Sequence, residues 1–175
     1  MTDFLRKIYL IRDLNFNLNV SKIDFTKKFR DNVDQSNLGY EPFEVFKSSS
    51  NEYKGNIFNN YFELKKRRKF FDTSYTFAKA EGIFIEENQQ LNIKVEINGF
   101  KKRMILFFGG MIIFYLIFIV GFFFIDNNEV PVFVLPFIVI HMAIMLGIPY
   151  FFIKRNVARM AYDLERDFHY WVTKN

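Results

Sequence analysis

Two long uncharged stretches constrain this chain more than any other feature of its sequence. Residues 104–125 and residues 132–153 are each 22 residues long and contain no Asp, Glu, Lys or Arg. At about 1.5 Å rise per residue, a helix of this length spans about 33 Å, enough to cross a hydrocarbon core of about 30 Å. A helix on a soluble protein would need a polar stripe, and neither stretch has one. The sequence therefore predicts two transmembrane helices.

The segments that flank the two spans predict their orientation. Residues 126–131 are the whole connection between them, so the helices must form an antiparallel hairpin. This connection has two acidic residues and no basic one, whereas both outer ends of the hairpin are basic. The basic residues at these ends include Lys101, Lys102, Arg103, Lys154 and Arg155. By the positive-inside rule both termini lie in the cytoplasm, so we expect a multi-pass protein of the cell inner (plasma) membrane.

Small and polar residues within the spans are the candidates for contacts inside the membrane. The small ones are Gly109, Gly110, Gly121 and Gly147. Because glycine lets helix backbones approach closely, we expect these positions to serve helix packing rather than a transport path. His141 lies near mid-membrane, where an ionisable side chain is a functional candidate. With no acidic partner in either span, the favoured interpretation is a neutral imidazole bonded to a carbonyl or to Tyr115 on the facing helix.

Residues 1–100 have the pattern of a small α+β domain. Ser21 is a good N-cap for a helix at 21–33, in which Ile23, Phe29 and Val33 share a face, and a loop follows at 34–42. Residues 91–97 alternate strictly between apolar and polar, which is typical of a strand buried on one face. Strand patterns occur at 4–13, 43–47, 53–58, 61–71, 74–87 and 91–100, with a tight turn at 59–60. We expect a mostly antiparallel sheet of four or five strands.

The tail after the second span, residues 154–175, has the pattern of an amphipathic helix. Its apolar residues recur at three- and four-residue steps: Val157, Met160, Ala161, Leu164, Phe168, Trp171 and Val172. We expect this helix to dock on the sheet, so that the hairpin of residues 101–153 is inserted between two parts of one cytosolic domain. In the alternatives, the helix lies in the plane of the lipid headgroups or forms the seam of a coiled-coil dimer.

Five consecutive basic residues follow Leu64 on a predicted strand: Lys65, Lys66, Arg67, Arg68 and Lys69. Successive side chains of a strand point to opposite faces, so this run puts charge on both sides and predicts an edge strand or an extended hairpin arm. In one interpretation the bases prevent edge-to-edge pairing. In the other they contact anionic lipid of the cytosolic leaflet, together with Lys101, Lys102, Arg103, Lys154 and Arg155. A protein partner or a nucleic acid is the remaining alternative.

The order of these segments resembles a family of bacterial membrane proteins. The resemblance rests on the hairpin pattern of residues 53–71, the strand "LNIKVEI" of residues 91–97, the two spans and the helical tail. Members of that family have a small β-rich cytosolic domain, a two-helix membrane segment and a closing helix. The arrangement is also similar to proteins that combine pleckstrin-like modules with transmembrane hairpins. The resemblance implies a scaffold for lipid or protein binding and lends no catalytic residues; the helix at 22–33 departs from its pattern.

The sequence offers no recognisable catalytic or cofactor motif. It has no cysteine, and its two histidines, His141 and His169, lie in separate segments. There is no glycine-rich phosphate loop and no nucleophile elbow. We therefore expect no enzyme activity, no catalytic residue, no cofactor and no metal.

The expected function is binding. In the leading hypothesis the cytosolic domain binds a membrane-protein partner, a second copy or anionic lipid headgroups. In the alternative the chain is an accessory subunit of a larger transport or secretion assembly, and the hairpin is its packing surface. An enzyme acting on lipid would need a polar pocket of converging acids or histidines. Nucleic acid is not an expected partner, because much of the cytosolic excess of about seven positive charges lies beside the membrane.

Overall fold

The computed structural model describes residues 1–39, 43–46, 49–69, 76–87, 90–124 and 133–173. These residues divide into two compact units. The first unit combines Met1–Gly99 with Lys154–Asn175, and the second is Phe100–Ile153. The predicted turn at 126–131 lies outside the described residues.

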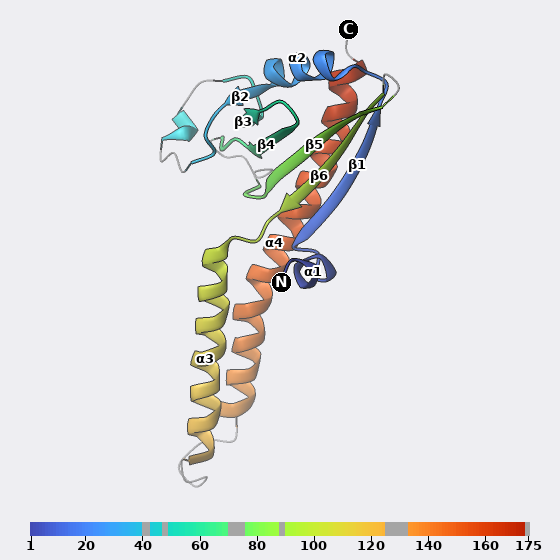
Figure 1. The fold of residues 1–175 in the computed structure, drawn as a ribbon. Coiled ribbons are helices and arrows are strands. Elements are labelled where there is room, and N and C mark those ends of the chain that lie inside the picture. The colour runs from blue at the N-terminus through green and yellow to red at the C-terminus, as the bar shows by residue number, and fades with distance from the viewer. Residues whose placement is uncertain (40–42, 47–48, 70–75, 88–89, 125–132, 174–175) are drawn as a thin grey trace. The chain divides into compact units, whose positions relative to one another are not determined.

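The described part of the first unit contains a six-stranded sheet, so the predicted α+β class with a mostly antiparallel sheet is confirmed. The predicted number of four or five strands is too low, because residues 33–35, predicted as the end of a helix and the start of a loop, form a strand. Its strands are β1 (Ile11–Leu18), β2 (Val33–Gln35), β3 (Tyr53–Ile57), β4 (Tyr61–Lys66), β5 (Lys79–Glu87) and β6 (Gln90–Asn98). They lie in the order β1-β6-β5-β4-β3-β2 (Figure 1). All neighbours are antiparallel except β2 and β3, which are parallel.

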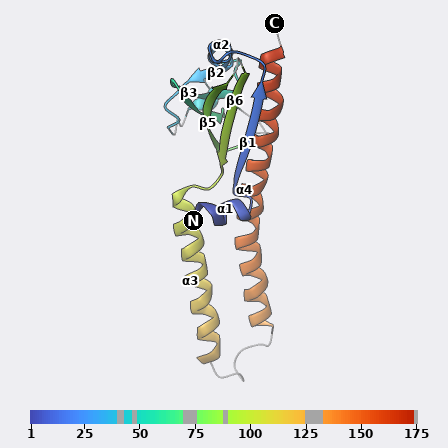
Figure 2. The ribbon, with the colours of Figure 1, turned by 45° about the vertical axis from the view of Figure 1, so that its right-hand side comes forward.

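One face of the sheet carries the core of the first unit. The alternation predicted for β6 is confirmed, because all four of its apolar residues are buried: Leu91, Ile93, Val95 and Ile97. Helix α2 (Lys22–Asn32) and the second half of α4 (Val134–Thr173) pack on this face (Figures 1 and 2). The apolar face of the tail lies in the same core, with Val157, Met160, Ala161, Leu164, Phe168 and Trp171 buried.

The N-terminus differs from the strand predicted at 4–13. Helix α1 (Thr2–Lys7) occupies the first half of that segment. The chain leaves this helix in a Schellman motif, in which the N–H of Leu10 donates to the carbonyl of Leu5 at 2.9 Å. Tyr9 adopts the left-handed conformation that such an end requires, with φ of 59°. The buried pair Leu5 and Leu10 therefore closes a helix end rather than alternating along a strand.

The strand predicted at 43–47 is also wrong. The described part of this segment is a 3-10 helix, η1 (Glu44–Phe46). Glu44 is buried, and the Nζ of Lys54 on β3 donates to its carboxylate at 2.8 Å. This ion pair holds η1 against β3, and η1 is not a further strand of the sheet.

Helix α2 begins where the sequence predicts, but one residue of its predicted apolar face is exposed. The Ser21 hydroxyl accepts the N–H of Asp24, as expected for an N-cap. Phe25 and Phe29 are buried against the sheet, whereas Ile23 is 82 % exposed. Phe29 and Val33 are thus buried as predicted, whereas the prediction for Ile23 is wrong and Phe25 takes its place in the core.

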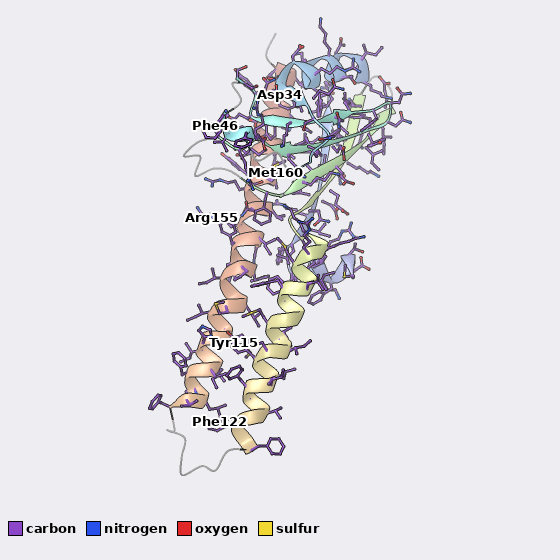
Figure 3. The ribbon with its side chains drawn as sticks, turned by 90° about the vertical axis from the view of Figure 1, so that its left-hand side faces the viewer. Asp34, Phe46, Tyr115, Phe122, Arg155 and Met160 are labelled. Carbon is purple, nitrogen blue, oxygen red and sulfur yellow. The ribbon has the colours of Figure 1, made fainter. Side chains whose placement is uncertain are left out.

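The second unit consists of two long apolar helices, α3 (Lys102–Phe124) and the first half of α4. They lie side by side, and side chains project from them on all sides (Figure 3). Both are long and apolar enough to cross a membrane. Most of their large apolar side chains are exposed, for example Leu106, Ile117 and Ile140.

Candidate functional site

The basic run Lys65–Lys69 begins in an interior strand of the sheet and not in an edge strand. Strand β4 is paired with β3 on one side and β5 on the other, and it ends at Lys66. Lys66 points to the core face, where its Nζ donates to Asp163 Oδ2 of α4 at 2.8 Å. Lys66 is 6 % exposed in this contact. The predicted edge strand is therefore wrong, because β4 has a paired strand on each side. Lys66 can be buried in this interior strand because the carboxylate of Asp163 on the tail neutralises its charge.

Other members of the run also have partners within the unit. The guanidinium of Arg67, which is buried, bonds to the carboxylate of Asp34 on β2. The Nζ of Lys65 donates to the carbonyl of Leu38 at 2.8 Å. Burial makes Lys66 and Arg67 unsuited to a lipid contact, whereas Arg68 and Lys69 are exposed. The predicted lipid contact therefore loses two of its members.

The basic residues predicted beside the membrane are mostly exposed. Lys101, Lys102 and Arg103 are exposed at the start of α3, and so is Arg155. Lys154 is half-buried, with its Nζ 4.7 Å from the centre of the Tyr9 ring. The geometry of this pair is that of a cation–π interaction.

Polar side chains of α4 tie the tail to β3. Tyr53 Oη donates to Asp167 Oδ2 at 2.6 Å, and Arg166 Nε donates to Asp167 Oδ1 at 2.7 Å. Burial, and secondly the bond to Asp167, raise the pKa of the Tyr53 phenol far above its ordinary value. Together with the Lys66–Asp163 pair, these bonds fix the position of the tail along the sheet.

The pKa of Asp34 is lowered, in contrast to that of Tyr53. Partial burial alone would raise the pKa of this carboxyl, but hydrogen bonds from Ser49 and Asn51 and the charge of Arg67 outweigh it. The net effect is a pKa below the ordinary value of a free aspartate. Asp34 is therefore a structural anion that joins β2 to the end of β4.

The second unit contains the predicted bond between Tyr115 and His141. The phenol oxygen lies 2.7 Å from His141 Nδ1, and Tyr115 is buried between α3 and α4 (Figure 3). The predicted hydrogen bond of His141 to Tyr115 is therefore present. The glycines behave differently: a Cβ added at Gly109, Gly110, Gly121 or Gly147 would meet no atom within 4 Å. These glycines therefore do not lie where α3 and α4 contact each other, although the sequence predicted that they serve helix packing.

The open face of the sheet, opposite α2 and α4, carries the most unusual arrangement of charges. Four carboxylates form one row across four neighbouring strands: Glu63, Glu81, Glu96 and Asp13. Each is the direct cross-strand partner of the next. Like charges in this position destabilise a sheet unless cations compensate them.

Two cations lie on this carboxylate row. Lys79 bridges Glu63 at 2.5 Å and Glu81 at 2.8 Å. Arg6 of α1 bonds to Asp13 at 2.9 Å and also to Glu96. For Lys79, burial alone would lower the pKa, but the bonds to the two glutamates outweigh it and raise the pKa.

A groove of about 520 Å³ runs over the open face beside this row. The row supplies one of its sides through Asp13, Glu81 and Glu96. Residues of the adjacent row, among them Tyr61, Ile83 and Lys94, supply the other. Ile83 is 55 % exposed and Tyr61 48 % exposed. The groove therefore combines apolar surface with acidic side chains.

Sequence reasoning missed this groove. Glu81 and Glu96 were visible as outward positions of strands, but the row depends on the register that sets β4, β5, β6 and β1 beside one another. The described residues contain no group of three or more His, Asp or Glu residues placed to hold a metal ion.

Comparisons of the chain with protein-family models, curated proteins and solved structures find no match. The resemblance to bacterial two-helix membrane proteins therefore stays a prediction. The fold and the site define an α+β unit, joined through α4 to a pair of long apolar helices, with a charged groove on its open sheet face.

Proposed function

We propose that this chain is a non-enzymatic protein of the inner (plasma) membrane, anchored by its two apolar helices, whose soluble unit binds a protein partner. The observation that carries the anchoring is the exposure of the helices. Leu106 is 79 % exposed, Ile117 65 % and Ile140 59 %. A continuous apolar surface of this kind needs a membrane or another protein to cover it. Lipid acyl chains provide that cover along the whole length of both helices.

The charge distribution supports a topology with both termini in the cytoplasm. Lys101 precedes α3, and Lys102 and Arg103 are its first two residues. Lys154 and Arg155 follow the apolar part of α4, so both outer ends of the helix pair are basic. The connection between the helices contains Asp126 and Glu129 and no base. In this topology the two chain segments of the first unit fold together on one side of the membrane.

Cysteine labelling tests the topology cleanly, because the chain has no native cysteine. We expect a membrane-impermeant maleimide to label Asn127→Cys in intact cells. Ser50→Cys should react only after the cells are permeabilised, and the native chain is the unlabelled control. Labelling of both variants in intact cells, or of neither after permeabilisation, would reject the anchoring and its orientation.

The open face of the sheet is the proposed surface for the partner. The other face is filled by α2 and α4, whereas Ile83 and Tyr61 leave apolar area uncovered beside charged side chains. An anionic membrane surface is the weaker candidate for the binding function, because Lys66 and Arg67 are buried in ion pairs. The partner is therefore proposed to be a protein.

Site-specific photo-crosslinking in native membranes tests this surface. We expect a photoreactive phenylalanine analogue at Ile83 to give a defined protein adduct that mass spectrometry identifies. The matched control position is Tyr170 on the tail helix, which is equally exposed at 55 %. The same adducts from both positions, or none from Ile83, would reject the open face as the partner surface.

The second candidate function is that of an accessory subunit in a larger membrane assembly. The glycines of the helix pair favour it, because all four leave open space next to the backbone where another helix could pack closely. Native mass spectrometry after gentle extraction distinguishes the candidates. A stoichiometric complex that Gly110→Leu disrupts and Ile83→Ala leaves intact would favour the assembly; a lone chain would reject it.

A further inference from the structure

We infer that the groove on the open face receives a basic side chain, lysine or arginine, from the protein partner, and that this cation binds between Glu81 and Glu96. The inference rests on the proposed function and adds the chemistry of recognition to it. It follows from the order of charges along the carboxylate row.

The row contains three neighbouring pairs of carboxylates. They are Glu63 with Glu81, Glu81 with Glu96, and Glu96 with Asp13, each joined by direct cross-strand register. Directly opposite side chains on neighbouring strands have Cβ atoms about 5 Å apart, so each pair is repulsive on its own. The same short separation suits a bridging ammonium or guanidinium group.

A cation bridges the first and third of these pairs but not the second. Lys79 bonds to both members of the first pair, and Arg6 bonds to both members of the third. For Glu81 with Glu96, no ion pair to a shared cation is found among the described residues. Among the described residues, each of these two glutamates is bonded to a cation on its outer side, Lys79 or Arg6, and only the middle pair of the row has no cation that bridges both members.

This middle position is open to a partner. Glu81 and Glu96 both line the groove, and their side chains are 62 % and 39 % exposed. Ile83 lies on the same face of β5 two residues from Glu81 and gives apolar surface for the stem of a lysine or arginine side chain. Arg6 and Lys79 show the kind of group that the row already holds. The groove is therefore complementary to a basic residue next to an apolar one in an extended segment.

A pair of peptides that differ in charge alone tests the inference on the full chain. The chain is placed in nanodiscs of phosphatidylcholine, which carry no net lipid charge. The probes are a fluorescent Val-Arg-Val-Arg-Val peptide and its citrulline counterpart, which keeps the shape of arginine without the charge. We expect saturable binding of the arginine peptide and binding of the citrulline peptide weaker by about tenfold or more.

Two variants with the same change of net charge localise the binding. Glu81→Gln should weaken binding of the arginine peptide by about tenfold, whereas Glu165→Gln, an exposed glutamate on the tail helix, should leave it unchanged. Glu81→Gln removes a like-charge neighbour of Glu96 but also one of the two carboxylates bonded to Lys79, so we expect its stability to stay close to that of the native chain. Thermal unfolding of each variant verifies this.

The possible results separate the inference from the proposed function. No saturable binding of the arginine peptide, equal binding of both peptides, or equal effects of the two variants would overturn the basic-residue inference. A specific adduct from Ile83 in native membranes would then still support a protein partner on the open face. Absence of that adduct would reject the proposed function itself, whatever the peptides do.

Discussion

Single residues decide how closely the strands of this sheet can approach. At Gly55 on β3, an added Cβ would lie 2.1 Å from the backbone oxygen of Glu63 and 2.8 Å from the Cα of Leu64. These are backbone atoms of the paired strand β4 and cannot rotate away. We expect Gly55→Ala to lower the free energy of unfolding by about 2 kcal/mol or more, measured by denaturant unfolding in detergent.

The matched control is Gly39→Ala. Its added Cβ would meet the Oδ1 atom of Asn37 at 3.3 Å, at the end of a flexible side chain. We expect a change within about 0.5 kcal/mol. Equal losses for the two variants would contradict the assignment of Gly55 to a close contact between strands.

The buried pair Lys66–Asp163 gives a second prediction at this scale. The two side chains are 6 % and 9 % exposed. Asp163→Ala leaves the Lys66 ammonium buried without its main partner, so we expect a loss of about 3 kcal/mol in the free energy of unfolding. Combining Lys66→Met with Asp163→Leu should restore most of it, because no charge then remains to be desolvated.

The control is Asp13→Ala, in an exposed pair with Arg6, which should lose less than about 1 kcal/mol. A loss similar to that of Asp163→Ala would contradict the burial argument.

At the scale of elements, local pattern was a reliable guide only where burial follows the period of the element. In β6 every second residue is apolar and buried, and the tail keeps one apolar face from Val157 to Trp171. Helix α1 was missed because its apolar residues serve a helix end whose left-handed residue is Tyr9 rather than glycine. The edge interpretation of the basic run failed because its partner, Asp163, lies about a hundred residues away in sequence.

The tail helix provides the prediction for this scale. Phe168 is fully buried, and its ring lies 5.2 Å from that of Phe16 and 5.3 Å from that of Phe25. We expect Phe168→Ala to lower the free energy of unfolding by about 3–5 kcal/mol, since it leaves a cavity among rings from three elements. Tyr162→Ala, on the same helix and 66 % exposed, should change it by less than about 0.5 kcal/mol. Comparable losses would mean that the tail does not contribute to the core.

At the scale of the whole molecule, the first unit is built from two segments that are far apart in the sequence. Residues of Met1–Gly99 and of Lys154–Asn175 share a single core, although the apolar helices separate them in sequence. The first unit thus contains its own hydrophobic core and needs no residue of the second unit to complete the cluster.

This organisation predicts that the first unit folds without the apolar helices. We expect a chain in which a Gly/Ser linker of about 15 residues replaces residues 101–153 to be water-soluble, because such a linker reaches up to about 50 Å. It should unfold in one cooperative transition by near-ultraviolet circular dichroism. A chain lacking residues 154–175 as well should fail to give that transition. Aggregation of the linked chain would contradict an independent core.

The sequence by itself determined the features that depend on local composition and period: the two long apolar helices, the capped helix α2, the one-faced strand β6 and the amphipathic tail. Only the tertiary structure decided where charges act. Register brings four carboxylates from four strands into one row, and the approach of α4 buries Lys66 against Asp163. The physical reason is that hydrophobic periodicity depends only on residues that are close together in the sequence. Whether a charge is compensated depends on which distant segment the fold places beside it.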